Sequence, residues 1–199
     1  MDCSMSMSCQ IDQLCKSLTF QLRKISSIRH YLTVEVTKTL VTSLILSRLD
    51  YCNSLLVGAR SKDICRLQSI QNNAARLILK KKRLAHSRPL LYELHWLPVK
   101  NRIEYKIALL CFKCLKGEAP RYLIDMIKVY TPGRALRSSS DPSILEIPKV
   151  NTTTFGERSF HVSGPRVWNS LPKSLRSIDG EYNFKKQLKH YLFMKAFYY

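Results

Sequence analysis

Acidic residues are scarce in this sequence, with 14 Asp and Glu against 33 Lys and Arg and a net charge of +19. Glycine (6) and proline (8) are also few, which excludes fibrous and low-complexity chains. No apolar run approaches the roughly 20 residues that a membrane span needs. The hydrophobic fraction of 45% allows a buried core, so the charge excess favours an anionic partner of a folded chain. Nucleic acid is the first such partner to consider, and an anionic membrane surface is the second.

The sequence also lacks the local motifs of common enzyme classes. No two acidic residues are adjacent, whereas two-metal phosphoryl chemistry needs clustered carboxylates. There is no glycine-rich phosphate loop, no nucleophile elbow and no histidine beside a nucleophile. Cys111 and Cys114 form one CxxC pair, but a structural zinc needs a second Cys or His pair at similar spacing. We therefore expect no catalysis by this chain alone, and neither a metal nor another cofactor.

The seven cysteines are an odd number in a chain too large to depend on disulfides. The first ten residues have no cationic segment followed by an apolar run, so they do not resemble a secretory signal. We expect reduced thiols, no membrane association, and a cytoplasmic or nuclear location.

Helical periodicity dominates the first 116 residues. A first helix places five apolar positions on one face, namely Ile11, Leu14, Leu18, Leu22 and Ile25. Thr33 is expected to cap a second helix, which continues to Leu49 or beyond and stops by Gly58. Ser61 is expected to cap a third helix, whose inward stripe is Ile64, Leu67, Ile70 or Gln71, Ala74 and Ile78. These elements predict a three-helix bundle over residues 10–84, preceded by a tail over residues 1–9.

The remainder predicts further helices and a loop-rich end. Residues 85–130 form a helical region in which Pro89, Pro98 and Pro120 suit first turns of helices, the last reaching as far as Tyr130. Residues 131–151 have the composition of a loop or linker. Residues 152–199 end in an amphipathic helix with Phe184, Leu188, Tyr191 and Leu192 on its apolar face. With short strands expected at 144–147 and 159–162, the predicted fold class is mainly α.

The positive charge is densest in residues 51–100, which hold ten Lys and Arg against two Asp and Glu. The candidate nucleic-acid-binding residues are a helical stripe, a run at the expected end of the third helix, and lysines of the last helix: Arg66, Arg76, Lys80, Lys81, Lys82, Arg83, Arg88, Lys185, Lys186 and Lys189. A solvated charged face is the commonest origin of such a stripe, and cations at a helix C-terminus also complement the macrodipole. The total charge nevertheless favours sequence-tolerant phosphate contact, with a salt slope of roughly −4 to −7 for five to eight contacts.

The two tryptophans, Trp96 and Trp168, have side chains that could stack on bases. Both are flanked by apolar residues, which is more typical of core anchors. We expect them in the core.

Seven segments follow one another along the chain: SRLDYCNSLL at 47–56, LQSIQNNAARLI at 67–78, LHWLPV at 94–99 with RIEYK at 102–106, GEAPRYL at 117–123, YTP at 130–132 with RALRS at 134–138, GPRVWNSLP at 164–172, and FKKQLK at 184–189. In this order they resemble the region after the polymerase domain in non-LTR (LINE-type) retrotransposon reverse transcriptases of the CR1/L2/jockey-like group. The departures are small: Asn72 and Asn73 stand where an alanine-rich stretch is usual, and Ser87 and Arg88 where one apolar residue is common.

The resemblance implies a non-catalytic role. Full-length members of that group have an endonuclease, then fingers and palm with a catalytic aspartate pair, then thumb and C-terminal regions, and no position here matches the aspartate pair. Residues 10–84 would then be thumb-like and grip a primer–template duplex, and the rest would help to hold template RNA or target DNA. The expected partners are an RNA or DNA duplex and a polymerase domain outside this sequence. The alternative is a helical structural or protein-interaction domain without a nucleic-acid role.

Overall fold

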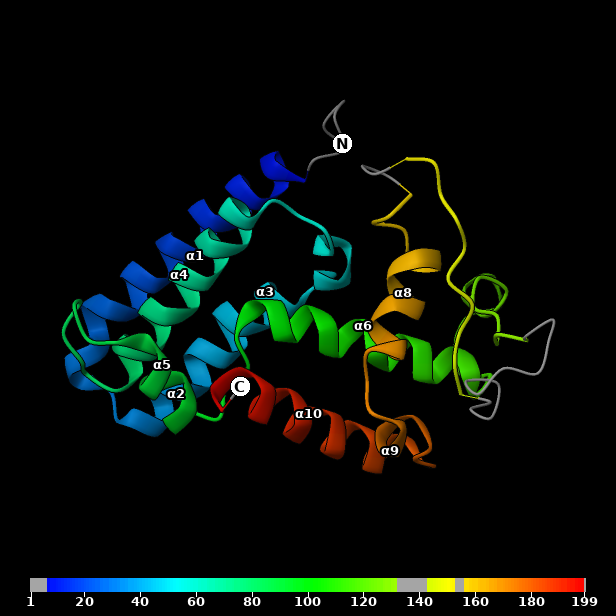
Figure 1. Ribbon diagram of the computed structural model, residues 1–199. Helices are drawn as coiled ribbons and strands as arrows, with labels where there is room; N and C mark the ends of the chain where they lie inside the picture. The colour runs from blue at the N-terminus through cyan, green and yellow to red at the C-terminus, as the bar shows by residue number, and fades with distance from the viewer. Residues whose placement is uncertain (1–6, 132–142, 153–155, 199) are drawn as a thin grey trace. The chain divides into compact units, whose positions relative to one another are not determined.

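The computed structural model describes residues 7–131, 143–152 and 156–198, and over these residues the protein is mainly helical (Figure 1). The predicted fold class is thus confirmed at this level. The chain divides into two compact units. Unit 1 comprises the residues up to Ile103 together with those from Phe193, and unit 2 comprises Glu104–Leu192. The functional segments expected to end at residues 84, 130 and 151 stay predictions.

In unit 1, helices α1 (Ser8–Ile28) and α4 (Ser61–Ile78) lie side by side and run in the same direction (Figure 1). Ser8 donates a hydrogen bond to Asp63 (2.9 Å) near the start of both helices. Two parallel neighbours need a connection that runs back along them. The chain makes that return with α2 (Val34–Val41), the π-helical segment η2 (Thr42–Leu46) and α3 (Ser47–Asp50).

The returning helix begins where the sequence predicts, because the Thr33 hydroxyl accepts a hydrogen bond from the backbone N–H of Val36 (3.3 Å). Its buried face is Thr37, Val41, Ile45, Leu46 and Leu49. The helix ends at Asp50, because Tyr51 is extended and Cys52 is left-handed (φ 51°). A short 3-10 turn, η3 (Asn53–Leu56), then leads to α4.

The apolar stripe predicted for the third helix is confirmed in α4 for Leu67, Ile70, Gln71, Ala74 and Ile78, which are buried, whereas Ile64 is only half-buried. Its predicted cap is wrong by one residue. The helix starts at Ser61, and the preceding carbonyl, that of Arg60, accepts the first hydrogen bonds of the turn.

Three helices follow α4 along the chain: α5 (Ser87–Glu93), α6 (Val99–Leu115) and α7 (Arg121–Ile124). Pro89 lies in the first turn of α5, as expected, whereas Pro98 and Pro120 immediately precede α6 and α7. The last of these helices is shorter than predicted, since α7 ends at Ile124 rather than near Tyr130.

Unit 2 has an aromatic core. Phe112 of α6 stacks on Phe184 of α10 (Glu181–Phe197) with ring centroids 4.3 Å apart. Trp168 of α8 (Phe160–Asn169) lies 5.7 Å from Phe184 and donates its indole N–H to the carbonyl of Ser143 (2.8 Å). A short helix, α9 (Lys173–Arg176), links α8 to α10. The prediction that both tryptophans are core residues is confirmed, with Trp168 1% and Trp96 7% exposed.

The predicted strand at 159–162 is wrong, because Ser159 precedes the first turn of α8 and its carbonyl accepts from the N–H of Ser163 (2.8 Å). The short apolar run belongs to a helical face that also buries Trp168. Gly164 on that face allows close packing, since a Cβ there would lie 3.0 Å from the sulfur of Cys111. A short apolar run fits either helix or strand, and here helix packing decided it.

The predicted strand at 144–147 is reduced to one antiparallel bridge between Val129 and Leu145. The flanking hydrogen bonds leave the N–H and carbonyl of Leu145 pointing away from Val129. Both groups are taken by the side-chain amide of Asn169 (2.9 and 2.8 Å). One amide therefore replaces the third strand that would extend the pairing. Much of the expected loop over 131–151 lies in residues 132–142, outside the described residues.

Candidate nucleic-acid interface

Two sets of polar side chains in unit 1 are candidates for a site. One is a network around Asp50 and Arg102, and the other is the run of cations after α4. The two sets differ in whether their polar atoms are engaged within the protein.

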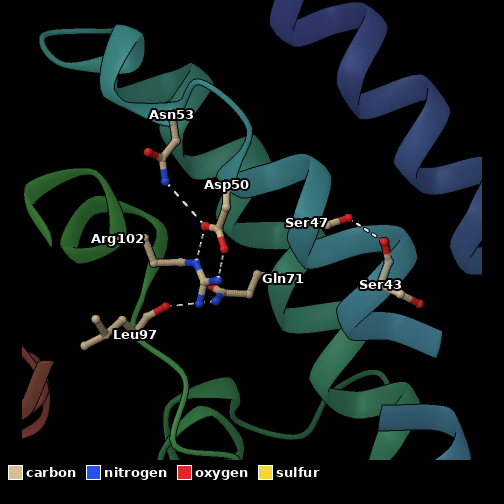
Figure 2. A network of polar contacts seen from close by, with 7 residues as sticks. All are labelled: Ser43, Ser47, Asp50, Asn53, Gln71, Leu97 and Arg102. Atoms are coloured by element: carbon tan, nitrogen blue, oxygen red, sulfur yellow. Dashed lines mark hydrogen bonds and ion pairs between the residues drawn. The ribbon is translucent and has the colours of Figure 1, made fainter. Parts of the chain in front are cut away.

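The first set begins with an ion pair between Arg102, in the first turn of α6, and Asp50 at the end of α3 (Figure 2). Arg102 donates from Nε to one carboxylate oxygen of Asp50 (2.7 Å) and from a terminal nitrogen to the other. The same carboxylate accepts from the amide of Asn53 (3.4 Å). The Arg102 side chain is only 18% exposed, whereas that of Asp50 is 41% exposed, so the two-pronged contact is partly shielded from solvent and holds α6 against the turn after α3.

The network continues through two glutamines of α4. Gln71 is fully buried and donates its amide to the carbonyl of Leu97 (2.9 Å; Figure 2). Gln68 donates to the Gln71 side chain (2.9 Å) and accepts from the backbone N–H of Val99 (2.8 Å). That N–H is one of the unpaired donors at the start of α6, so Gln68 caps this helix from a neighbouring one.

These contacts join three segments that lie apart in the sequence, 47–56, 67–78 and 94–99. Asp50 and Asn53 come from the first segment, Gln68 and Gln71 from the second, and the carbonyl of Leu97 from the third. Apart from the Oδ1 atom of Asn53, which is buried without a hydrogen-bond partner, these polar groups are engaged inside unit 1, so the main role of the network is to position helices.

Three of the predicted binding arginines are likewise engaged inside the protein. Arg66 forms ion pairs with Asp12 and Asp63. Arg76 donates to the carbonyl of Ala85 (3.0 Å). Arg88 donates to the carbonyls of Ala196 and Phe197 (3.3 and 2.9 Å), which are orphan acceptors at the end of α10. The structure gives these arginines contacts within the protein, and the contact of Arg76 with Ala85 lies in the segment that follows α4.

The run Lys80, Lys81, Lys82 and Arg83, here called the basic loop, is exposed throughout. Lys80 is left-handed (φ 51°), and the N–H of Lys81 returns to the carbonyl of Arg76 (3.0 Å), which ends α4 in a Schellman motif. The far end of the loop is held where Arg76 binds Ala85 and where the Ala85 N–H donates to Lys82 (3.0 Å). The loop is therefore anchored at both ends and presents four cations to solvent.

A buried arginine, Arg29, explains why these four cations are not needed to cap α4. Its guanidinium donates to the carbonyls of Leu77 (2.9 Å) and Ile78 (2.8 Å) in the last turn of α4 and to that of Leu32 (2.7 Å). Arg29 is only 7% exposed. Sequence reasoning missed this residue, although it lies four positions after Ile25 and so extends the inward face of α1 by one more turn.

The three predicted lysines of α10 belong to unit 2. Lys185 pairs with Glu181 one turn earlier (2.6 Å), and Glu181 also pairs with Lys113 of α6 (2.9 Å). Lys186 and Lys189 are exposed. Of this group, Lys185 is thus engaged within α10, and it is Glu181, through Lys113, that ties α10 to α6.

The cysteine pair of α6, Cys111 and Cys114, is buried, and burial raises the pKa of both thiols above the ordinary value. Within the described ranges no group of three or more His, Cys, Asp or Glu is placed to hold a metal ion. The six cysteines that the structure describes are free.

No protein-family model, curated protein or solved structure matches this chain. Among the described helices, none is both long and apolar enough to cross a membrane. The functional argument therefore depends on the geometry of unit 1, in which the basic loop is the most concentrated group of exposed cations identified from the sequence.

Proposed function

We propose that this chain is a non-catalytic nucleic-acid-binding module whose basic loop contacts the phosphates of an RNA or DNA duplex. The observation that carries the proposal is the set of four consecutive exposed cations beyond the end of α4, in a chain of net charge +19. Arg29 already satisfies carbonyls at that helix end, so helix capping does not account for the run. Phosphate contact gives these cations a role that the protein's own contacts do not supply.

The resemblance to LINE-type reverse transcriptases suggests the setting of this binding. There the bundle over residues 10–84 acts as a thumb on the primer–template or target duplex, and the terminal amphipathic helix belongs to the region that helps to hold template RNA or target DNA. RNA-directed DNA synthesis would be catalysed by a polymerase domain outside this sequence. Reading the coding DNA upstream of Met1 tests that setting: an open frame with an aspartate pair supports it, and an unrelated frame contradicts it.

Binding through the basic loop is expected to be tolerant of sequence, because phosphates carry no base information. Each neutralised phosphate of a duplex releases counterions and contributes about −0.9 to the slope of log K against log salt. The loop is anchored at Lys81 and Ala85 before it binds, which limits the conformational entropy lost on binding.

The decisive experiment compares two variants with the same loss of charge. One replaces all four residues of the basic loop by glutamine. The control replaces four exposed cations scattered over α1, α2 and α4 of the same unit: Lys16, Arg23, Lys38 and Lys62. Affinity for a fluorescent duplex is measured by anisotropy at several salt concentrations.

We expect the salt slope to be shallower by about 3 to 4 in the loop variant and nearly unchanged in the control. Equal effects of the two variants would show that only overall charge matters. An affinity of the unmodified chain that does not weaken with salt would overturn the phosphate contact altogether.

A second candidate is a helical protein-interaction domain. It is favoured by exposed apolar side chains on the returning helix, where Val36 is 47% and Leu44 is 40% exposed. Charge reversal across the basic loop separates the two functions: loss of duplex binding supports the first, whereas unchanged binding supports the second.

A further inference from the structure

The basic loop has a property beyond its charge, because its cations are consecutive and leave the helix together. The left-handed Lys80 ends α4, so Lys81, Lys82 and Arg83 follow in the connection to α5 (Figure 1). On a continued helix, successive side chains would point about 100° apart around the axis. A non-helical segment can instead extend along a groove and place alternate side chains against it, once the hydrogen bond of Ala85 to Lys82, which closes a turn in this loop, has opened.

We propose that the basic loop is also a nuclear-import signal, bound by a transport receptor whose peptide-binding groove is lined with carboxylates. Short runs rich in Lys and Arg are the sequence form of such signals. The inference goes beyond the proposed duplex binding, because it concerns a protein partner that reads the order of the cations as well as their charge.

Such a partner needs cations that are free to bind, a loop that is accessible, and a charge opposite to that of its groove, and the basic loop has all three. Its four cations are exposed, and none of them is paired with a carboxylate of the described residues. Leu84, which follows the run directly, is 94% exposed, so the tip of the loop is uncovered. The four positive charges are complementary to an acidic groove, which speeds encounter and favours this class of partner.

Order and charge can be separated by exchanging two neighbouring side chains. The double substitution Lys81→Leu with Leu84→Lys keeps the composition and net charge of the segment but interrupts the run. Both positions are exposed, and the hydrogen bond of residue 81 to Arg76 uses its backbone N–H, so the fold is retained. A groove with one site per side chain loses a charge contact in this variant, whereas phosphates do not discriminate between the two orders.

The test uses the full chain fused to a reporter too large to diffuse through nuclear pores, together with anisotropy measurements on a purified import receptor. The unmodified chain is expected to accumulate in nuclei and to bind the receptor. The exchanged variant and the four-glutamine loop variant should each bind the receptor at least about tenfold more weakly and stay cytoplasmic. The scattered control, with Lys16, Arg23, Lys38 and Lys62 replaced, should behave like the unmodified chain.

Two results would overturn the proposal. Nuclear accumulation of the exchanged variant would show that positive charge alone, and not the order of the cations, holds the protein in the nucleus. Receptor binding that survives in the four-glutamine variant would show that the import signal lies outside the basic loop. Circular dichroism establishes that each variant is folded. Duplex affinity of the exchanged variant, expected within about twofold of the unmodified chain, is measured separately, so failure of the import signal is distinguishable from failure of duplex binding.

Discussion

The two units of this protein use their positive charge differently. Unit 1 carries eighteen Lys and Arg against six Asp and Glu, and unit 2 carries fifteen against eight. In unit 2, Lys113 and Lys185 share Glu181, and Lys116 pairs with Asp179 (2.6 Å). In unit 1, Arg29 and Arg76 donate to backbone carbonyls, whereas the basic loop stays in solvent. The planar fork of arginine suits paired carbonyl acceptors, whereas the strongly hydrated ammonium of lysine favours exposure.

The units also differ in what holds their helices together. Unit 1 joins α3, α4 and α6 through buried polar contacts around Gln71 and Arg102. Unit 2 joins α6, α8 and α10 through aromatic stacking on Phe184. Each unit contains one of the two tryptophans, Trp96 in unit 1 and Trp168 in unit 2, so fluorescence can follow the two separately.

The largest expected effect is the loss of the aromatic core of unit 2. Phe184→Ala removes a fully buried ring and should lower the free energy of unfolding by about 3–5 kcal/mol. Urea denaturation followed by Trp168 fluorescence, in a Trp96→Phe background, measures it. Tyr182→Ala on the same helix is the control, because that side chain is 77% exposed. Similar midpoints for the two variants would contradict the aromatic core.

The second effect tests the inward arginine of unit 1. Arg29→Ala leaves buried carbonyls without their charged donor and should cost about 3 kcal/mol. The unfolding is followed by Trp96 fluorescence in a Trp168→Phe background. Arg23→Ala, an exposed position of the same helix, should change stability by less than about 0.5 kcal/mol. If the Arg29→Ala and Arg23→Ala variants have the same free energy of unfolding, Arg29 is not the cap of α4.

A smaller effect separates the stability of the basic loop from its binding. Lys80→Gly relieves the left-handed strain at φ 51° and should raise stability by about 0.5–1 kcal/mol. The same change removes one phosphate contact and should make the salt slope shallower by about 0.9. Lys81→Gly is the matched control, since it should weaken binding without the gain in stability. A loss of stability in Lys80→Gly would contradict the Schellman motif at this helix end.

The smallest effect is the pH dependence of the paired carboxylates of unit 2. Lys185, and after it Lys113, hold the pKa of Glu181 below its ordinary value. A lowered pKa in the folded state means that the stabilisation is complete above the unfolded pKa of about 4.3 and is lost as the pH falls through the folded value. The urea midpoint of unit 2, followed by Trp168, should therefore fall between about pH 5 and pH 3. Glu181→Gln should flatten this dependence, and an unchanged profile in that variant would exclude the ion pairs as its cause.

Periodicity was most informative where a long helix carries a continuous apolar stripe. The inward stripe of α4 was predicted almost residue by residue, because its apolar positions recur every three or four residues. The same method was wrong at 159–162, where a run of only four residues has no period that separates helix from strand. The basic loop could be found from composition alone, and the pairing of Arg66 with Asp63 lies within one helical turn. The contacts of Arg66 with Asp12, of Arg76 with Ala85 and of Arg88 with the end of α10 could not be found so, since each partner is contributed by another segment.

The sequence by itself determined that this protein is mainly helical, that both tryptophans are core residues, and that positive charge gathers after the third predicted helix. Local propensity and spacing are sufficient for these conclusions, because they depend on residues close together in the chain. Only the tertiary structure decided which cations are engaged and which face solvent. Arg29 caps α4 and Asn169 completes the pairing of Leu145 through contacts across many residues, and such contacts have no local signature. By satisfying the end of α4 from within, the fold leaves the basic loop exposed to solvent.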